Sequence, residues 1–204
     1  MRSRRIIPVL VWLLVWCGLT VVPSASGDGS TCQPAELFAA DESPLFEPQA
    51  VVTIALTGAA VTGSTPVDGV FWSNEPRHIT YERAREFHLC GVDEPTLHTV
   101  AEALRSQFNQ GSVLTFEYLP RTEADAVIIT VPDIDIARFR DAFVADSAAH
   151  QRLRGGSVTT ADHILILVAG NGDLDIAHRL VGAAGGRWSA ATIAYGRREF
   201  VNSA

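Results

Sequence analysis

The chain has 204 residues with 16 basic and 23 acidic side chains, which gives a formal net charge of −7 at pH 7. All the basic residues are arginine. The absence of lysine excludes a phosphate-binding loop of the GxxxxGK type, a Schiff-base amine and a Ser-Lys dyad. Because phosphate backbones bind clustered cations, the acidic balance argues against nucleic acid as a partner.

The first 26 residues have the layout of an export signal. Arg2, Arg4 and Arg5 precede an uncharged apolar run over residues 6–22, and small residues follow at 24–27. The run is close to the roughly 20 residues that span a bilayer, so a cleaved signal peptide and an uncleaved N-terminal anchor both stay open. Either way, the folded domain is expected outside the cytoplasm, secreted or anchored to the outer face of the plasma membrane.

Residues 27–48 contain Cys32 and three prolines without any periodic pattern, and we expect an extended arm there. Residues 49–204 are long enough for a single α+β domain with a substantial core. Cys32 and Cys90 are the only cysteines after residue 26. In an exported protein such a pair indicates a disulfide, which here would tie the arm to the domain; two separate buried thiols are the alternative.

The predicted elements of the first part of the domain are two strands followed by two helices. β-branched residues predict strands at 51–56 and 67–72. A helix is expected over 80–90, between Thr80 as cap and Gly91 as terminator. A second helix, over 93–108, has an Asp cap, a proline in its first turn and apolar residues at helical spacing.

The second part alternates strands and helices. Strands are expected at 113–118 and 126–131, joined as a hairpin by a polar turn. The remaining expected elements are a helix at 134–149, a strand at 163–169, a helix at 174–181 and a strand at 190–195. The strand at 163–169 is apolar on both faces and is therefore expected at the centre of a sheet.

This order of elements matches a ferredoxin-like βαββαβ pattern with an added αβ unit. The sequence therefore predicts an α+β fold, arranged as a two-layer sandwich. A three-layer α/β sheet is the alternative.

Two strand–turn–helix segments carry the same acidic motif. Asp133 and Asp135 follow one strand, while Asp173 and Asp175 follow another, with His178 just beyond. In a ferredoxin-like sheet both turns would emerge at one end, about 10 Å apart. Such carboxylates could hold a divalent cation or act as an acid and a base. Alternatively, each Asp only caps a helix.

No other motif identifies a reaction, and neither a cofactor nor a metal is predicted. The six histidines show no metal-ligand spacing, and Asp175 stands where a dinucleotide fingerprint would need its third glycine. We expect an exported, disulfide-tied domain, non-catalytic, that binds another protein or an envelope component, with membrane contact only through an uncleaved N-terminal segment. The alternative is a small secreted hydrolase or metal-dependent enzyme built on the acidic turns.

Overall fold

The structure, a computed structural model, describes residues 32–73, 78–80 and 83–202. The export signal or anchor predicted at residues 1–26 lies outside the described residues. No helix in the described part of the chain combines the length and the apolar character needed to cross a membrane.

The elements fall into two consecutive groups. The first group is β1 (Pro34–Ala40), α1 (Phe46–Leu56), β2 (Ala60–Ser73), β3 (His78–Thr80), β4 (Arg83–Cys90), α2 (Glu94–Gln107) and β5 (Ser112–Tyr118). The second group is β6 (Ala126–Val131), α3 (Ile136–Ala145), α4 (Ser147–Arg152), β7 (Gly155–Thr159), β8 (Leu165–Gly170), α5 (Leu174–Ala183) and β9 (Thr192–Asn202).

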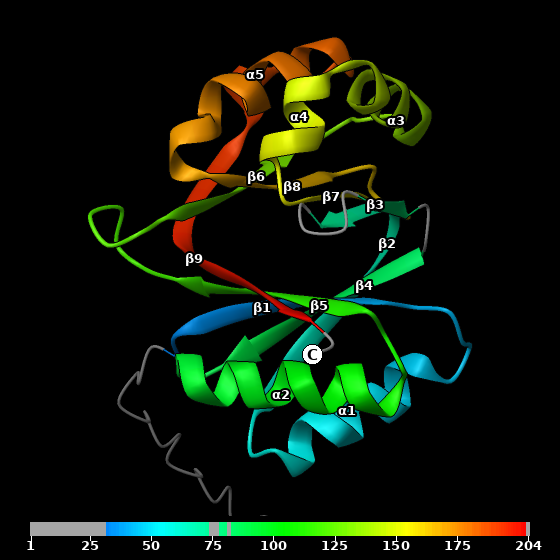
Figure 1. Cartoon of the computed structure of the whole chain (residues 1–204), viewed down its shortest axis with the longest axis vertical. Helices are drawn as coiled ribbons and strands as arrows, with labels where there is room; N and C mark the ends of the chain where they lie inside the picture. Colours follow the sequence, from blue (N-terminus) through cyan, green and yellow to red (C-terminus); the bar gives the residue numbers. More distant parts are fainter. Residues whose placement is uncertain (1–31, 74–77, 81–82, 203–204) are drawn as a thin grey trace, which may run out of the picture. The chain divides into compact units, whose positions relative to one another are not determined.

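Eight of these strands form a closed antiparallel barrel. The order is β2-β4-β1-β5-β9-β6-β8-β7, and pairing of β7 with β2 closes the ring, while β3 adds only to the far end of β2. Helices α1 and α2 cover one side of the barrel, and α3, α4 and α5 cover the other (Figure 1). Closure leaves the eight ring strands without a free edge.

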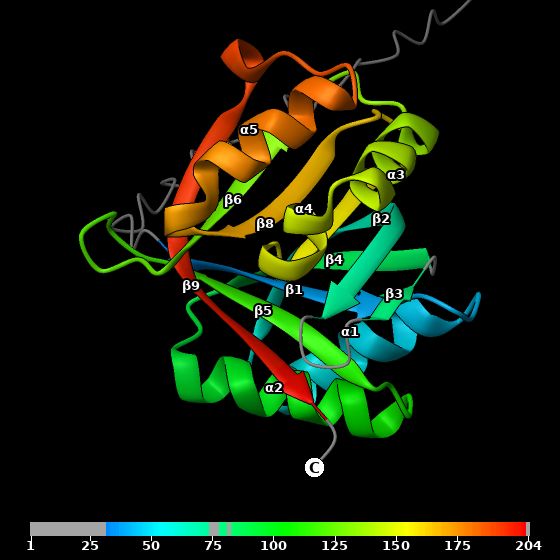
Figure 2. The ribbon, with the colours of Figure 1, turned by 45° about the horizontal axis from the view of Figure 1, so that its top comes forward.

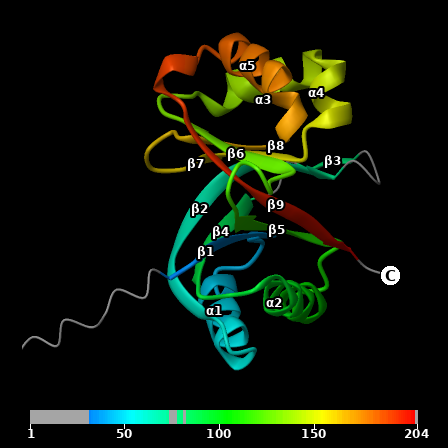
Figure 3. The ribbon, with the colours of Figure 1, turned by 90° about the vertical axis from the view of Figure 1, so that its left-hand side faces the viewer.

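Each group contributes four strands and repeats one arrangement. In the first group, β2, β4, β1 and β5 lie side by side; in the second, β7, β8, β6 and β9 occupy the corresponding places. The longest strands join the groups. One part of β2 pairs with β4 and another with β7, while β9 pairs with both β5 and β6. Figures 2 and 3 show both strands curving from one half to the other.

Alternation along the strands sorts the apolar residues into three cores. Outward-facing residues of the first half, such as Leu37 and Phe87, pack with α1 and α2. Those of the second half, such as Ile129 and Leu167, pack with α3, α4 and α5. The inward-facing residues form the third core, which fills the barrel interior: Phe38, Val67, Ala84, Leu114, Phe116, Ala126, Ile128, Ile166 and Val168.

The predicted two-layer sandwich is wrong, as is the three-layer alternative, because the strands close into a barrel. The expected hairpin between 113–118 and 126–131 is absent, since β9 lies between β5 and β6. The βαββαβ order expected once occurs twice, and each unit leaves two edge strands. Those edges pair with each other instead of facing solvent.

Three local predictions also fail. Residues 51–56 lie in α1, where Phe46, Ala50 and Ile54 are buried at helical spacing. Residues 83–90, expected as a helix, form β4, whose apolar and polar residues alternate. Within the stretch expected as an extended arm, residues 34–40 form β1, which lies between β4 and β5.

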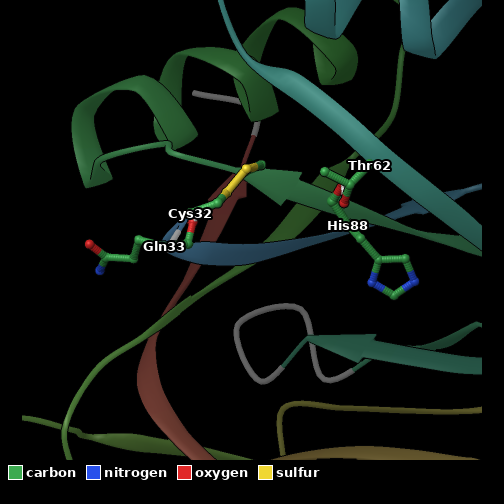
Figure 4. The surroundings of a disulfide bond; sticks show 5 residues. Cys32, Gln33, Thr62 and His88 are labelled. Carbon is green, nitrogen blue, oxygen red and sulfur yellow. Dashed lines mark hydrogen bonds between the residues drawn. A yellow bond between two sulfur atoms is a disulfide. The ribbon is translucent and has the colours of Figure 1, made fainter. Parts of the chain in front are cut away.

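The predicted disulfide between Cys32 and Cys90 is present, with 5.3 Å between the two Cα atoms. It joins the start of β1 to the end of β4, two strands that already pair with each other. Figure 4 shows the bridge and the nearby side chain of His88, whose ring points away from α2. A structural disulfide is typical of a protein that folds outside the reducing cytoplasm.

Candidate functional site

Three ionisable side chains from neighbouring strands meet in the first half of the barrel. Glu36 comes from β1, and Glu86 and His88 come from β4. One ligand atom from each, a carboxylate oxygen or an imidazole nitrogen, lies within 4.8 Å of the others. We call this group the Glu36–Glu86–His88 cluster.

Strand geometry accounts for this meeting. Glu86 and His88 are two residues apart on β4, so they share a face, and Phe87 and Leu89 between and beyond them pack outward with the helices. In the antiparallel register Glu36 pairs directly with His88. Directly opposite residues on one face lie close enough for their side chains to interact. All three side chains therefore face the barrel interior.

Hydrogen bonds hold the His88 ring and the Glu36 carboxylate. The Nδ1 of His88 lies 2.7 Å from Oε2 of Glu36, and its Nε2 lies 3.0 Å from the hydroxyl of Thr65 on β2. The Tyr118 hydroxyl, from β5, donates to Oε1 of Glu36 at 3.3 Å. Contacts from β1, β2, β4 and β5 thus fix the orientation of the His88 ring and the Glu36 carboxylate.

Glu86 differs from Glu36 in lacking such support. Its residue is only 7% exposed, and no hydrogen bond from a described residue reaches its carboxylate. Burial, and secondarily the neighbouring Glu36, raise the pKa of Glu86 to about 7, while His88 lowers it. This carboxylate therefore gives up its proton reluctantly near neutral pH, in contrast to an exposed glutamate.

The hydrogen bond to Glu36 raises the pKa of His88, although burial acts in the opposite direction. Burial and the two glutamates raise the pKa of Tyr118, which keeps its hydroxyl protonated as a donor. The His88 side chain is 37% exposed, against 8% for that of Glu36. The cluster therefore reaches solvent on the side of His88, while the glutamates lie deeper.

The acidic turns predicted from the sequence do not come together. Strands β6 and β8, which precede them, are direct antiparallel neighbours, with Ala126 opposite Gly170 and Val131 opposite Leu165. The turns after β6 and β8 therefore emerge at opposite ends of the sheet, about 17 Å apart at the usual rise along a strand. The expectation that both lie at one end is wrong.

Each predicted site residue has a separate place. Asp135 is the N-cap of α3 and accepts a hydrogen bond from the Arg138 backbone N–H at 2.9 Å, whereas exposed Asp133 has a positive φ of 61° in the preceding turn. Buried Asp173 pairs with Arg152. Exposed Asp175 lies in the first turn of α5, and the His178 ring is 4.8 Å from that of Trp188.

The sequence reasoning missed Glu36, Glu86 and His88. Glu36 was placed in an arm, and the other two in a helix, where positions two apart do not share a face. One available signal was the period-two alternation that is typical of a strand: Ala84, Glu86 and His88 alternate with Phe87 and Leu89. Nothing local pairs Glu36 with residues about fifty positions later along the chain.

No family model matches this chain, and no curated protein matches it. Among solved structures, the regulatory subunit of aspartate kinase from Thermus flavus has 13% identity and a TM-score of 0.34, over 76% of this chain and 94% of that one. An anthrone oxidase-like protein has 10% identity and a TM-score of 0.27, over 84% and 94%. These low values support no conclusion about fold or function.

Proposed function

We propose that this protein is an exported binding domain that holds a cation inside its barrel. The observation that carries the proposal is the Glu36–Glu86–His88 cluster, in which two buried carboxylates and an imidazole face one another. Acidic side chains are rarely buried without a partner, because water solvates their charge far better than an apolar interior does. A bound cation would supply the missing charge.

The pKa of Glu86 indicates how strongly this position needs positive charge. At about 7, the carboxyl group retains a proton at pH values where ordinary glutamates have lost it. A proton and a cation compete for the same oxygen atoms. A cation that binds both carboxylates removes the repulsion between them and displaces that proton.

Two features support export. The N-terminal residues have the pattern of a signal peptide or anchor, and the Cys32–Cys90 disulfide is typical of an oxidising compartment. The test is the intact mass of the protein from its native host, measured for membrane and secreted fractions. Alkylation of Cys32 and Cys90 only after reduction supports export, whereas free thiols in freshly isolated protein would contradict it.

Cation binding is tested by thermal unfolding of the oxidised protein during titration with Mg²⁺, Ca²⁺, Mn²⁺ and Zn²⁺. A ligand at 100 times its Kd stabilises the native state by about 2.7 kcal/mol, so a rise in Tm with at least one cation is expected. Glu86→Gln should abolish the rise. Glu123→Gln, the same change on an exposed turn, should retain it. An unchanged Tm with all four cations contradicts the proposal.

A second candidate is a secreted hydrolase, and one observation favours it. Thr65, His88 and Glu36 form a hydroxyl–imidazole–carboxylate chain with steps of 3.0 and 2.7 Å, the arrangement of a nucleophile, a base and an orienting acid. Hydrolysis of p-nitrophenyl acetate tests it. The hydrolase requires turnover that Thr65→Val removes and Glu86→Gln retains, since Glu86 has no place in that chain.

A further inference from the structure

We propose that the cation is a divalent transition metal of the zinc class, bound by Nδ1 of His88 and by one oxygen each of Glu36 and Glu86. This inference rests on the proposed function and narrows it. Thr65 and Tyr118 act as positioning residues that hold the outer atoms of the ligands. The fourth coordination position is left to water or to a small ligand.

The kinds of donor atom select the metal. Calcium and magnesium take oxygen ligands almost exclusively, and magnesium parts with its water reluctantly. Zinc and its neighbours accept imidazole nitrogen together with carboxylate oxygen, and sites with an open position use three protein ligands. An imidazole grouped with two buried carboxylates therefore matches the zinc class better than the hard cations.

The distances require only small movements. Ligand atoms about 2.1 Å from a tetrahedral zinc ion lie about 3.4 Å from one another. The Nδ1 of His88 and Oε2 of Glu36 are already 2.7 Å apart, and the cluster's donors all lie within 4.8 Å. The ion would replace the hydrogen bond between these two atoms, and Glu86 would rotate toward it.

The Glu86 carboxylate is the second, independent observation that indicates a ligand. The Glu86 residue is only 7% exposed, its carboxylate lies within 4.8 Å of the other two donors, and no hydrogen bond from a residue in the described part of the chain reaches it. A buried carboxylate is destabilising unless another group compensates its charge. Metal coordination gives this carboxylate its partner.

The atoms pointing away from the ion are already engaged. Once Nδ1 binds metal, Nε2 carries the proton and can donate it to the Thr65 hydroxyl, now 3.0 Å away. The Tyr118 hydroxyl donates to the second oxygen of Glu36 at 3.3 Å. Metal-binding histidines and carboxylates usually have such outer hydrogen bonds, and losing one typically weakens metal affinity 10- to 100-fold.

Access to the ion is through His88. Its side chain is 37% exposed, while Glu36 and Glu86 lie behind it among apolar residues of the barrel interior. The open coordination position is therefore expected on the solvent side of the imidazole. The antiparallel pair of β1 and β4 carries all three ligands and holds them in register.

The test uses the protein with its disulfide oxidised and Co²⁺ as a coloured substitute for Zn²⁺. Strong visible absorption of the four-coordinate ion is expected, and stoichiometric Zn²⁺ should abolish it while a large excess of Ca²⁺ should not. His88→Gln should lower the affinity at least 100-fold, and Thr65→Val and Tyr118→Phe about 10- to 100-fold each. The matched control is His98→Gln. It removes a histidine from an exposed His–Glu pair and should leave the Co²⁺ affinity unchanged.

A measurement on the unaltered sequence covers variants that fail to fold. With ¹⁵N-labelled histidine, Zn²⁺ should give a single histidine with a metal-bound Nδ1 and a protonated Nε2, whereas a histidine with a metal-bound Nε2 and a protonated Nδ1 would overturn the assignment. Binding of Ca²⁺ or Mg²⁺ that needs Glu86 but not His88 would overturn this inference and leave the proposed function standing. No binding of any cation overturns both.

Discussion

The two halves of the barrel share one order of strands and helices but present different side chains to the interior. In the first half, inward positions of β1 and β4 carry Glu36, Glu86 and His88. In the second half, the corresponding strands β6 and β8 carry Ala126, Ile128, Ile166 and Val168. On these strands the first half therefore presents polar residues, partly open to solvent at His88, and the second half presents apolar ones. We call them the polar half and the apolar half, although Ser157, Thr159 and Asp173 of the second half are also buried.

This difference shows how a fold and a site can be separated. Pairing of β5 with β9 and of β2 with β7 closes the barrel and places both sets of residues inside. Any chemistry then depends on which residues occupy the inward positions. The apolar half lowers the effective dielectric around the polar half, which strengthens charge interactions there and raises the cost of an unpaired carboxylate.

The largest effect is expected from making the apolar half polar. Ile128 is 3% exposed and lies opposite Val168 on the neighbouring strand. Ile128→Glu buries a carboxylate without a partner, which should lower the free energy of unfolding by about 5 kcal/mol. Urea unfolding measures the loss. Ile128→Val, the control, should cost about 1 kcal/mol; a folded and stable Glu variant would mean that water reaches this half.

The disulfide is a second difference, since it ties only the polar half. The bridge closes a segment with a sequence separation of 58. In the chain-entropy model, replacing both cysteines by serine should lower the free energy of unfolding by about 4 kcal/mol. Urea unfolding of the double variant and of the oxidised protein measures this difference in the free energy of unfolding. Equal urea midpoints would show that strand pairing alone holds β1 against β4.

A third effect follows from the raised pKa of Glu86, from the usual 4.5 to about 7. A raised pKa contributes stability below pH 4.5 that is lost as the pH rises through 7. Without added metal, Glu86→Gln should therefore be more stable than the unaltered protein at pH 8, by about 3 kcal/mol, and by less than about 1 kcal/mol at pH 5. Thermal unfolding at both pH values measures this. Parallel pH profiles would contradict the burial of a charged Glu86.

The smallest effect should be the same in both halves. Asp93 caps α2 and accepts from the Thr96 N–H at 3.0 Å, as Asp135 caps α3 in the other half. Replacing either by alanine should cost about 1 kcal/mol and leave cation binding unchanged. Urea unfolding and a cation titration measure the two quantities. Loss of cation binding in Asp135→Ala would mean that the acidic turn before α3 contributes to the cation site.

Local chemistry determined the elements that were predicted correctly. Helix α2 follows from an Asp cap, an early proline and apolar residues at helical spacing, and β6 and β8 follow from short apolar runs. The cysteine pair was also predictable, because only two cysteines follow the export pattern and the bridge is present. Each of these features depends on residues close in sequence or on simple counting.

The closure of the barrel and the composition of the site were decided by the tertiary structure. Pairing of Val67 with Thr159 joins residues from the two halves, and Glu36 meets His88 only because β1 inserts between β4 and β5. Such contacts depend on which strand edges remain free after the local elements form, and free edges pair with each other. The sequence alone determined helices α2, α3 and α5, several strands and the disulfide, while strand pairing over long separations decided which side chains share the barrel interior.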